Sequence, residues 1–573
     1  MNQPSPRSRP SRRRAIPPAG RRFPAVLPAF LLALLVAPPC IAAVVCVDDD
    51  NATGVADGSA LHPYPTLQAA VDAASAGDEI RAAAGAYARV EVRSKALRLR
   101  GGYAGGSASD YASGAGGDFA TRDPLTRVSH VQGDGAHATV SLQVTDNDPS
   151  SLAGTVVDGF RITGGTHGIS CGPDGWPDPV GVTLSGNRVE NNGTADGSAG
   201  NRGGGIWATG HQIHIVNNVI RDNVAGRAGG LFAAASLEGG TGTMLIEENL
   251  IRDNRGYGDH GGGVCLAAGV VTFRNNVVDG NRVMESYGWG GGLLTYAEEA
   301  HLSGNVFRNN FAPSYGGAVF VDEGGKAWLD HELYYGNTTS SSDKGGAALA
   351  VDSGPGPSHA WLDHCTFALN TAPGALGGNA VFVDNDSHVT VKNCIFWGNS
   401  TGDVYVREGS TLQAAYTLSL GGLPGAGNIT ADPLFADPAA GDFHLKSAGG
   451  RWDPSAGGGA GGWVADALTS PALDAADPAS PWAEEPSPNG GRANLGCYGN
   501  TAQASRTPGG ASPFDLNRDG LVNAADLALL GAWFAGSLPQ LPCGIACADV
   551  DGSGSADAAD LVALARAVVK TGA

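Results

Sequence analysis

A nine-residue pattern of apolar and polar positions recurs along the middle of the chain. Its first and sixth residues are mostly apolar, its fourth is often Asn, and its ninth is Asn in the clear copies. These copies end at Asn192, Asn223, Asn254, Asn281, Asn310, Asn337, Asn370 and Asn399, and a weaker copy ends at Gly165. Successive copies lie 27–33 residues apart, which predicts a repeating structural unit.

A polar loop, a glycine cluster and a second apolar run follow most copies, as in residues 203–209 and 316–322. The pattern in each unit therefore predicts two or three short strands, and it shows no helical periodicity. A unit of about 29 residues is too short for a propeller blade, and the spacing of leucine-rich repeats is absent. A coil that adds one layer of parallel strands per turn fits the pattern, with layers about 4.8 Å apart.

The repeated Asn residues are predicted to be structural. We expect the side-chain amide of each terminal Asn to hydrogen-bond to its equivalents in the layers above and below. We also expect these residues to take the left-handed backbone conformation that a tight corner requires, which Asn tolerates. The glycines would serve another corner.

This pattern resembles the right-handed parallel β-helix superfamily, which includes pectate lyases and many bacterial surface proteins. The resemblance covers residues 44–420 and begins with HPYPTLQAAVDAASAGDEIRAAAGAY from His62. In that superfamily an amphipathic helix, here about Thr66 to Ala74, caps the first rung and shields its edge. The predicted fold is therefore an all-β, right-handed parallel β-helix solenoid with an N-terminal cap over residues 44–427.

The first 43 residues have the features of an export signal. Seven arginines precede an apolar run from Phe23 to Ala37, and Ala42 and Ala43 offer a cleavage site. The chain has 36 basic and 56 acidic side chains, so removal of the signal leaves a net charge near −27. Such an acidic protein disfavours nucleic acid and anionic membranes. No later apolar run is long enough to predict a membrane span.

The segment over residues 428–505 resembles the choice-of-anchor Q region that follows such β-helices in bacterial exported proteins. The matching segments are ADPLFADPAAGDFHLKS, SPALDAADP and NGGRANLGCYGN. They predict irregular structure that closes the last rung. Residues 506–513 then form a predicted linker.

Two twelve-residue loops near the C-terminus have the spacing of a calcium site. They run from Asp515 to Asp526 and from Asp549 to Asp560, with side-chain oxygens at positions 1, 3, 5 and 9 and Gly at position 6. Calcium prefers six or more oxygen ligands, and the glycine permits the sharp turn. Asp stands at position 12 of each loop, and a helix is expected after it, over 527–533 and 561–569.

These loops are similar to type I dockerin modules, which predicts a small α-helical calcium module over residues 514–573. By that resemblance the Ca²⁺ ligands are Asp515, Asn517, Asp519, the Leu521 carbonyl and Asp526 in the first loop, and Asp549, Asp551, Ser553, the Ser555 carbonyl and Asp560 in the second. The implied partner is a cohesin-like protein. Just before position 12, where dockerins usually have a pair of hydroxyl residues, the two loops have alanine pairs at 524–525 and 558–559. Three interpretations therefore stay open: binding of a cohesin, attachment to another partner, and a calcium-stabilised end of the chain.

The cysteines do not form a disulfide scaffold. Cys543 and Cys547 are the most plausible disulfide. Cys365 and Cys394 occupy equivalent positions in consecutive repeats, which is compatible with a disulfide or with buried free thiols.

Strand alternation predicts which side chains form columns on the surface of the coil. One column brings together His301, Trp328 and Trp361 as candidate substrate-binding residues. The neighbouring column brings together Asp330, Asp363 and Lys392 as candidate catalytic residues. Flat rings beside carboxylates suit a sugar-binding groove, and two carboxylates one rung apart can hold calcium, share a proton or act as acid and base. The alternative is that duplicated rungs repeat these residues without a function, with His331 and His364 as a stacked pair.

The loops before the glycine clusters offer a second patch, at residues 257–260, 285–289 and Tyr315. No known catalytic motif matches the chain. The sequence therefore leaves the enzyme question open, between a polysaccharide lyase or glycoside hydrolase, a protein that binds extracellular polysaccharide, and a structural or adhesive exoprotein.

Overall fold

The computed structural model describes residues 42–172, 177–195, 201–237, 240–354, 356–373, 379–407 and 409–508, and, in the C-terminal module, residues 516–517, 524–538, 541, 548–550 and 556–571. Residues 1–41 of the predicted export signal and the Cys543–Cys547 pair lie outside these residues.

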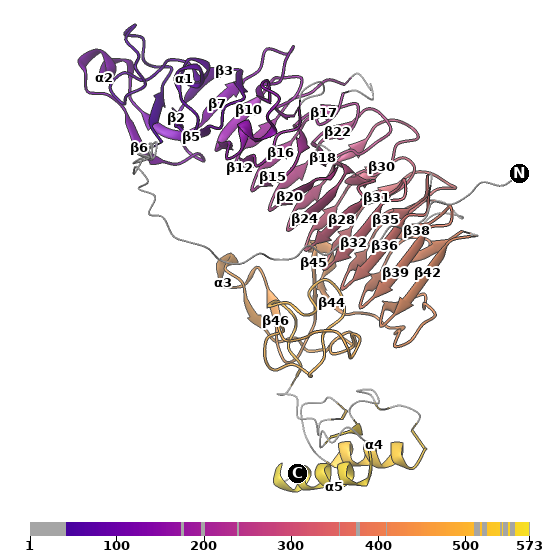
Figure 1. The fold of residues 1–573 in the computed structure, drawn as a ribbon. Coiled ribbons are helices and arrows are strands. Elements are labelled where there is room, and N and C mark those ends of the chain that lie inside the picture. Colours follow the sequence, from indigo (N-terminus) through magenta and orange to yellow (C-terminus); the bar gives the residue numbers. More distant parts are fainter. Residues whose placement is uncertain are drawn as a thin grey trace, which may run out of the picture. The chain divides into compact units, whose positions relative to one another are not determined.

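Three long parallel sheets wind around one core, which confirms the predicted all-β solenoid (Figure 1). Sheet A consists of β1 (Val44–Val47), β2 (Glu79–Ala83), β5 (Arg98–Gly105), β9 (Val156–Asp158), β12 (Thr183–Ser185), β15 (Ile213–Val216), β20 (Thr243–Glu247), β24 (Val270–Arg274), β28 (Glu299–Ser303), β32 (Lys326–Asp330), β36 (His359–Asp363), β39 (His388–Lys392) and β42 (Thr411–Ala415).

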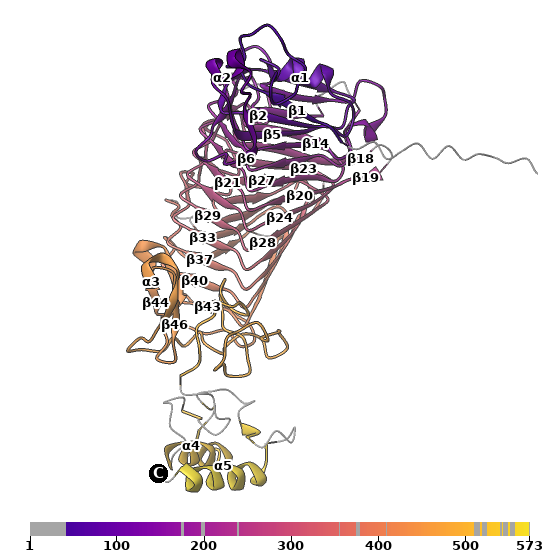
Figure 2. The same ribbon diagram turned by 90° about the vertical axis from the view of Figure 1, so that its left-hand side faces the viewer.

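Sheet B follows sheet A in each rung (Figure 2). It consists of β3 (Gly85–Ala88), β7 (Ser129–Gln132), β10 (Phe160–Thr163), β13 (Arg188–Glu190), β16 (Val219–Arg221), β21 (Leu250–Arg252), β25 (Val277–Asp279), β29 (Val306–Arg308), β33 (Leu333–Tyr335), β37 (Thr366–Ala368), β40 (Ile395–Trp397) and β43 (Leu418–Ser419). A short sheet lies beyond it, formed by β17 (Val224–Ala225), β22 (Arg255–Gly256), β26 (Arg282–Val283), β30 (Phe311–Ala312) and β34 (Thr338–Thr339).

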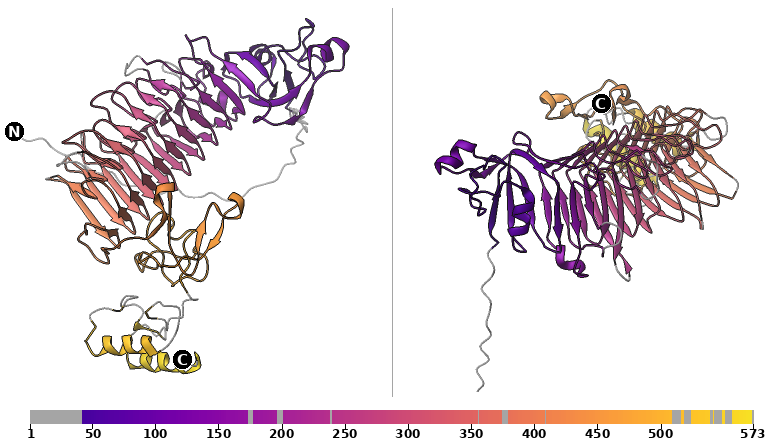
Figure 3. Two further views of the ribbon diagram at one scale, coloured as in Figure 1. Left: turned by 180° about the vertical axis from the view of Figure 1, so that it is seen from behind. Right: turned by 90° about the horizontal axis from the view of Figure 1, so that it is seen from above.

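Sheet C completes each rung, and the same stacking is visible from behind and from above (Figure 3). It consists of β4 (Val90–Arg93), β8 (Val140–Gln143), β11 (Ile169–Cys171), β14 (Ile206–Gly210), β18 (Leu231–Leu237), β23 (Val264–Ala268), β27 (Leu293–Thr295), β31 (Val319–Val321), β35 (Leu349–Val351), β38 (Val381–Val383) and β41 (Val404–Val406).

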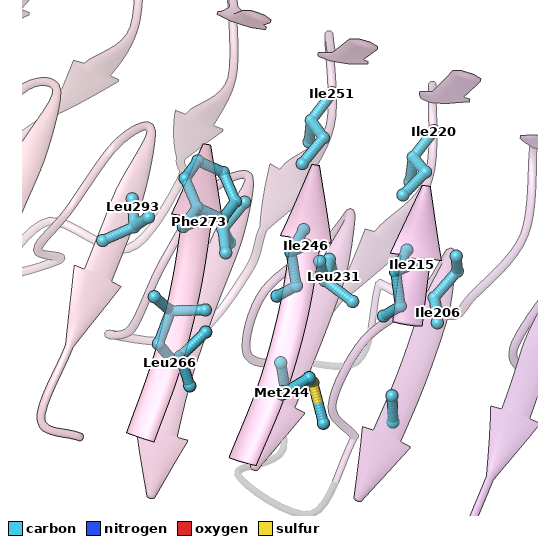
Figure 4. Close-up of a cluster of buried hydrophobic side chains, with 14 of the residues drawn as sticks. Ile206, Ile215, Ile220, Leu231, Met244, Ile246, Ile251, Leu266, Phe273 and Leu293 are labelled. Atoms are coloured by element: carbon cyan, nitrogen blue, oxygen red, sulfur yellow. The ribbon is translucent and has the colours of Figure 1, made fainter. Parts of the chain in front are cut away.

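The first apolar residue of each nine-residue phrase points into the core. Ile215, Ile246 and Phe273 are buried on neighbouring sheet A strands and converge with sheet C residues such as Leu231 (Figure 4). Sheet C is buried on both faces, because loops cover a row of aromatic and apolar side chains on its outer side. The parallel register therefore turns one repeated pattern into one continuous core.

The terminal Asn residues form the predicted ladder between rungs. The Asn254 Nδ2 group donates to the Asn281 Oδ1 atom at 2.9 Å and to the Ile220 carbonyl at 2.9 Å. The Asn254 Oδ1 atom accepts from the backbone and side-chain N–H groups of Asn223 at 3.0 and 3.1 Å. The same contacts recur from Asn192 to Asn399. Each amide satisfies buried backbone groups that would otherwise lack a partner.

The expectation that these Asn residues are themselves left-handed is wrong. The positive φ angle falls on the preceding residue, as at Asp222, Asp253 and Gly280. The corner residue turns the chain while its side chain points to solvent, and the next residue turns its amide inward. Two neighbouring residues divide these tasks, because one side chain cannot point both to solvent and into the solenoid.

A second ladder runs along the corner between sheets A and B and changes chemistry at its end. Asn187, Asn218, Asn249, Asn276 and Asn305 are linked in the same way, and Glu332, Cys365 and Cys394 continue the row. The Asn305 Nδ2 group donates to the buried Glu332 Oε1 atom at 2.9 Å. Burial raises the pKa of Glu332 well above its usual value, so the protonated carboxyl replaces an amide. Cys365 and Cys394 are free buried thiols rather than a disulfide.

The two ends of the solenoid are covered differently. Helix α1 (Leu67–Ala73), with Thr66 as its N-cap, packs on the first rung as predicted. Helix α2 (Ala108–Ser113) and β6 (Asp118–Arg122) also belong to this end.

The segment after the coil contains β44 (Phe435–Asp437), β45 (Asp442–Leu445), β46 (Arg451–Asp453), α3 (Ala456–Gly459) and β47 (Gly462–Val464). Its apolar residues pack on Leu333, Ala368, Ile395 and Leu418 of sheet B. It therefore extends along the side of several rungs and does not only close the last one.

The C-terminal module contains two helices, α4 (Ala524–Phe534) and α5 (Ala558–Thr571), which pack against each other as expected. Among the described residues, none of the helices has both the length and the apolar character needed to cross a membrane.

Replacing Asn254 by Ala is expected to destabilise the solenoid by roughly 2–4 kcal/mol, because buried backbone groups lose their partners. Urea unfolding followed by circular dichroism measures this change. The matched control is Asn275→Gly, at an exposed corner position with φ 54°, which should leave stability nearly unchanged. Equal losses in both variants would contradict the ladder's role.

Replacing Glu332 by Gln should reduce the pH dependence of stability. The folded state keeps a proton on Glu332 that the unfolded chain releases, so wild-type stability falls as the pH rises above the usual carboxyl pKa of 4.5. Gln carries no such proton and keeps the hydrogen bonds to Asn305. The difference between the two proteins should grow between pH 5 and pH 8 by up to roughly 1 kcal/mol per pH unit. A difference in unfolding free energy between the two proteins that is the same at pH 5 and at pH 8 would contradict this prediction.

Candidate functional site

The predicted surface columns lie in register on the outer face of sheet A. His301 pairs with Trp328, and Trp328 pairs with Trp361, on β28, β32 and β36. Asp330 pairs with Asp363, which pairs with Lys392 on β39. The structure therefore brings the predicted binding and catalytic residues together, as strand alternation implies.

The aromatic rings in the first column stack on one another. The centroids of Trp328 and Trp361 are 4.7 Å apart with an interplanar angle of 14°, and His301 stacks on the other face of Trp328 at 4.6 Å. Both faces of Trp328 are thus occupied by neighbouring rungs. The stack offers its ring edges to a ligand instead of the flat faces that the sequence suggested for sugar binding.

The carboxylates of the second column are ion-paired. The Lys392 Nζ atom lies 3.7 Å from Asp363 and 3.5 Å from Asp477 of the C-terminal segment. Burial alone would raise the pKa of Asp363, but hydrogen bonds from His364 and Asn393 and the nearby Lys392 ammonium lower it overall. Asp363 is therefore an ionised carboxylate at neutral pH.

An open hollow of about 470 Å³ lies on the same face, over β15, β20 and β24. His214, Leu245 and Thr272, which continue the column of His301, line it together with Arg274. Glu247 bridges His214 at 2.7 Å and Arg274 at 2.6 Å. The face of sheet A therefore provides an open depression, lined by apolar as well as polar side chains, next to the aromatic stack.

A third row of polar residues was missed by sequence reasoning. Asp322, Asp352 and Asp384 each follow the last residue of a sheet C strand, at the corner that leads into sheet A. The ends of these strands pair as Val321 with Val351 and Val351 with Val383. The three side chains, which we name the carboxylate row, therefore lie on consecutive rungs, spaced by about 4.8 Å per rung.

The carboxylate row is surrounded by hydrogen-bonding side chains and aromatic rings. The Tyr315 hydroxyl donates to the Asp384 Oδ2 atom at 3.1 Å, and the Lys344 ammonium donates to Tyr315 at 2.5 Å. Arg407 binds the same carboxylate at 2.8 Å.

The Asn385 amide donates to Asp352 at 2.6 Å. The rings of Phe320 and Phe382, on the outer face of sheet C, pack against Tyr315. Titratable, polar and aromatic groups thus converge at this corner.

Two members of the row have raised pKa values. Burial raises the pKa of Asp322 to about 6, and the charges of Asp352 and Glu323 add to the increase. Burial also raises the pKa of Asp352, although hydrogen bonds from Asn385 and Ser353 oppose it. Asp384 instead has the Arg407 guanidinium as a partner. Carboxyl groups whose environments separate their acid strengths are typical of acid–base sites.

A sequence signal for this row exists. An Asp follows the second apolar run in the segments VFVD, LAVD and VFVD that end at residues 322, 352 and 384. The predicted surface columns do not include these Asp residues, because the columns follow the Asn-containing phrase and the Asp residues follow the second apolar run. Of the predicted loop patch, Tyr315 belongs to the row's surroundings, while His260 and Trp289 pack together at 5.2 Å.

The structure describes the last residue of each predicted calcium loop. Asp526 and Asp560, at position 12 of each loop, are fully buried in the first turns of α4 and α5. The Asp526 Oδ1 atom accepts hydrogen bonds from the N–H groups of Leu516 at 2.7 Å and Asn517 at 3.0 Å. A buried carboxylate that closes an oxygen-rich loop fits Ca²⁺.

Asn517 and Asp549 are also described, whereas Asp515, Asp519, Leu521, Asp551, Ser553 and Ser555 lie outside the described residues.

Comparison with family models matches the right-handed β-helix region over residues 126–312 and 291–418, which together exceed half of the 573 residues. The chain belongs to the right-handed β-helix family. A type I dockerin domain matches residues 513–569 of this β-helix protein. Dockerin modules belong to extracellular proteins, generally bind calcium and pair with cohesins. A third model, described as disaggregatase related, matches residues 369–476.

Two solved structures are similar to this β-helix protein. The GH136 lacto-N-biosidase from Eubacterium ramulus shares 12% identity, with a TM-score of 0.37, over 64% of this chain. The chain spans 65% of the length of that protein. A complex of XylC with xylose shares 11% identity, with a TM-score of 0.39, over 69% of this chain and 87% of its own. No curated protein matches the chain.

Removal of calcium should destabilise the dockerin module without affecting the solenoid. A ligand present at 100 times its dissociation constant stabilises a fold by roughly 3 kcal/mol, so chelation should lower the melting temperature of the helical module and Ca²⁺ should restore it. Asp526→Ala and Asp560→Ala should reduce this response, while Asp50→Asn in the solenoid should retain it. Calorimetric melting with and without chelator measures the effect, and a response that survives both Ala variants would contradict the assignment.

Proposed function

We propose that this protein is a secreted enzyme that hydrolyses glycosidic bonds of an extracellular polysaccharide at the carboxylate row. The observation that carries the proposal is the contrast between the half-buried Asp322, whose pKa is raised to about 6, and Asp384, whose carboxylate is ion-paired with Arg407. Glycoside hydrolysis requires one protonated and one ionised carboxyl group on either side of the scissile bond.

Asp322 acts as the general acid and Asp384 as the general base. Two rungs separate them, which corresponds to about 9.6 Å between strands. This spacing suits an inverting mechanism, in which a water molecule fits between the base and the sugar. Asp322 donates a proton to the leaving-group oxygen, and Asp384 accepts one from the attacking water. Asp352, between them, raises the pKa of Asp322 by its charge.

The dockerin match supports a role outside the cell, attached to a cohesin-like partner through the calcium loops. The net charge of the chain, −20 before removal of the predicted signal, favours a neutral over a polyanionic glycan, because a polyanion would be repelled. The alternative is a non-catalytic protein that binds glycans along sheet A or serves as a structural exoprotein.

Two sets of predicted roles stay predictions: catalysis by Asp330, Asp363 and Lys392, and substrate binding by His301, Trp328 and Trp361. The stacked rings and the ion-paired Lys392 make them a weaker choice for the chemistry. A lyase that uses Lys392 as its base would yield an unsaturated uronate, whereas hydrolysis yields only a new reducing end. The two products therefore distinguish the two sites.

The test is an assay of the mature protein with Ca²⁺ on a panel of neutral and uronic-acid polysaccharides, following both reducing ends and unsaturated-uronate absorbance. Asp322→Asn and Asp384→Asn should lower the rate of hydrolysis by roughly 100- to 10,000-fold. Asp386→Asn, an exposed carboxylate at the same corner, is the matched control. The wild-type rate should fall as the pH rises through about 6, because Asp322 loses its proton.

Loss of activity in Asp363→Asn or Lys392→Ala, but not in the carboxylate-row variants, would indicate that the reaction takes place on the face of sheet A. Retention of one polysaccharide in affinity electrophoresis with no product would leave a binding protein.

A further inference from the structure

A duplicated Asp–His pair lies at the corner where sheet A ends. Asp330 is the last residue of β32 and His331 follows it, and Asp363 and His364 occupy the same positions one rung later. Both histidines have the left-handed backbone, with φ angles of 56° and 47°, as Asn275 and Asn393 do at the equivalent corner; His adopts it more readily than most residue types. Their imidazole rings stack with centroids 5.0 Å apart and an interplanar angle of 5°.

Three of these side chains present ligand atoms to one another. A carboxylate oxygen of Asp330 and one ring nitrogen each of His331 and His364 lie within 4.8 Å of one another. A shift of less than about 1 Å per atom brings such a triad to the bond lengths of about 2.0–2.2 Å that Zn²⁺ makes with nitrogen and oxygen. Asp330 is the most exposed member, with 52% of its side chain accessible.

A hydrogen bond to the C-terminal segment holds one ring nitrogen of His331. Its Nε2 atom lies 2.8 Å from the Gly499 carbonyl oxygen, which can only accept, so Nε2 carries the hydrogen. The Nδ1 atom of the same ring lies 2.8 Å from a carboxylate oxygen of Asp330 and donates a hydrogen bond to it in the protonated ring. A metal ion bound between the two would take the place of that proton. Metal-binding histidines characteristically donate their other ring N–H to a carbonyl or carboxylate in this way.

His364 adds a second, independent observation. Its side chain is only 3% exposed, and among the described residues its Nε2 atom has no hydrogen-bond partner. A buried ring nitrogen without a partner is costly unless a ligand or water satisfies it.

We propose that Asp330, His331 and His364 bind one divalent transition-metal ion of the Zn²⁺ class. Two imidazole nitrogens and one carboxylate oxygen form a donor set that suits Zn²⁺ and is unlike the all-oxygen sets of Ca²⁺ and Mg²⁺. Three protein ligands leave one position for water on the exposed side of Asp330. The site is separate from the carboxylate row and from the calcium loops, and it joins two rungs at the point where Gly499 contacts the solenoid.

The test is titration of the metal-stripped, untagged full-length mature protein with Zn²⁺ by isothermal calorimetry, in saturating Ca²⁺ so that the dockerin loops are filled. We expect one Zn²⁺ per chain. Asp330→Asn and His331→Ala should each weaken binding by at least 10-fold. Asp330→Asn alters an exposed side chain, so it tests the site even if the histidine variant is unstable.

The matched control is His359→Ala. His359 and His388 form another histidine pair on adjacent rungs of sheet A, with centroids 4.9 Å apart, and the variant should bind Zn²⁺ like the wild type. Co²⁺ in place of Zn²⁺ should give an intense visible spectrum that is lost in Asp330→Asn. Absence of Zn²⁺ uptake in Ca²⁺, equal uptake by the Asp330 and His331 variants, or equal loss in His359→Ala would overturn the proposal.

Discussion

The parallel register between successive rungs is the constraint on which the rest of this structure depends. Backbone hydrogen bonds place each residue beside its equivalent one rung away, about 4.8 Å distant. Any repeated side chain therefore contacts its own copies. Repeated Asn residues become amide ladders, as from Asn192 to Asn399. Repeated aromatic residues become stacks, as at Phe307, Tyr334, Phe367 and Phe396 inside the core.

The same constraint makes departures from the repeat informative. A carboxyl at this buried ladder position favours its protonated form, because burial disfavours the charge, and this raises the pKa of Glu332. Carboxylates on consecutive rungs also repel one another, so the charge of Asp352 raises the pKa of Asp322, while Asp384 is ion-paired with Arg407 and Asp352 accepts a hydrogen bond from Asn385. The row, the Asp–His pairs and the altered ladder all lie between β31 and β40, whereas the rungs from Asn187 to Asn305 keep Asn at the ladder position. The last rungs are thus where the side chains depart most from the repeat.

The C-terminal segment contributes to these rungs from outside the repeat. Its apolar residues cover the outer face of sheet B, and its polar groups reach the corner beside sheet A, where Gly499 contacts His331 and Asp477 contacts Lys392. Such contacts join residues more than 80 positions apart. The segment therefore both shields the sheet and sets the surroundings of the side chains at the corner.

The sequence by itself determined the solenoid, the Asn ladder, the surface columns, the capping helix and the two helices of the C-terminal module. These features depend on local periodicity and on a register that repeats, so position within the phrase fixes position in space. Only the tertiary structure decided which residue carries the left-handed corner, that Trp328 and Trp361 cover each other's faces, and that three Asp residues converge beside Tyr315 and Arg407. These outcomes depend on how loops of unequal length fold back over sheet C, and on side-chain burial, which a repeat pattern does not encode.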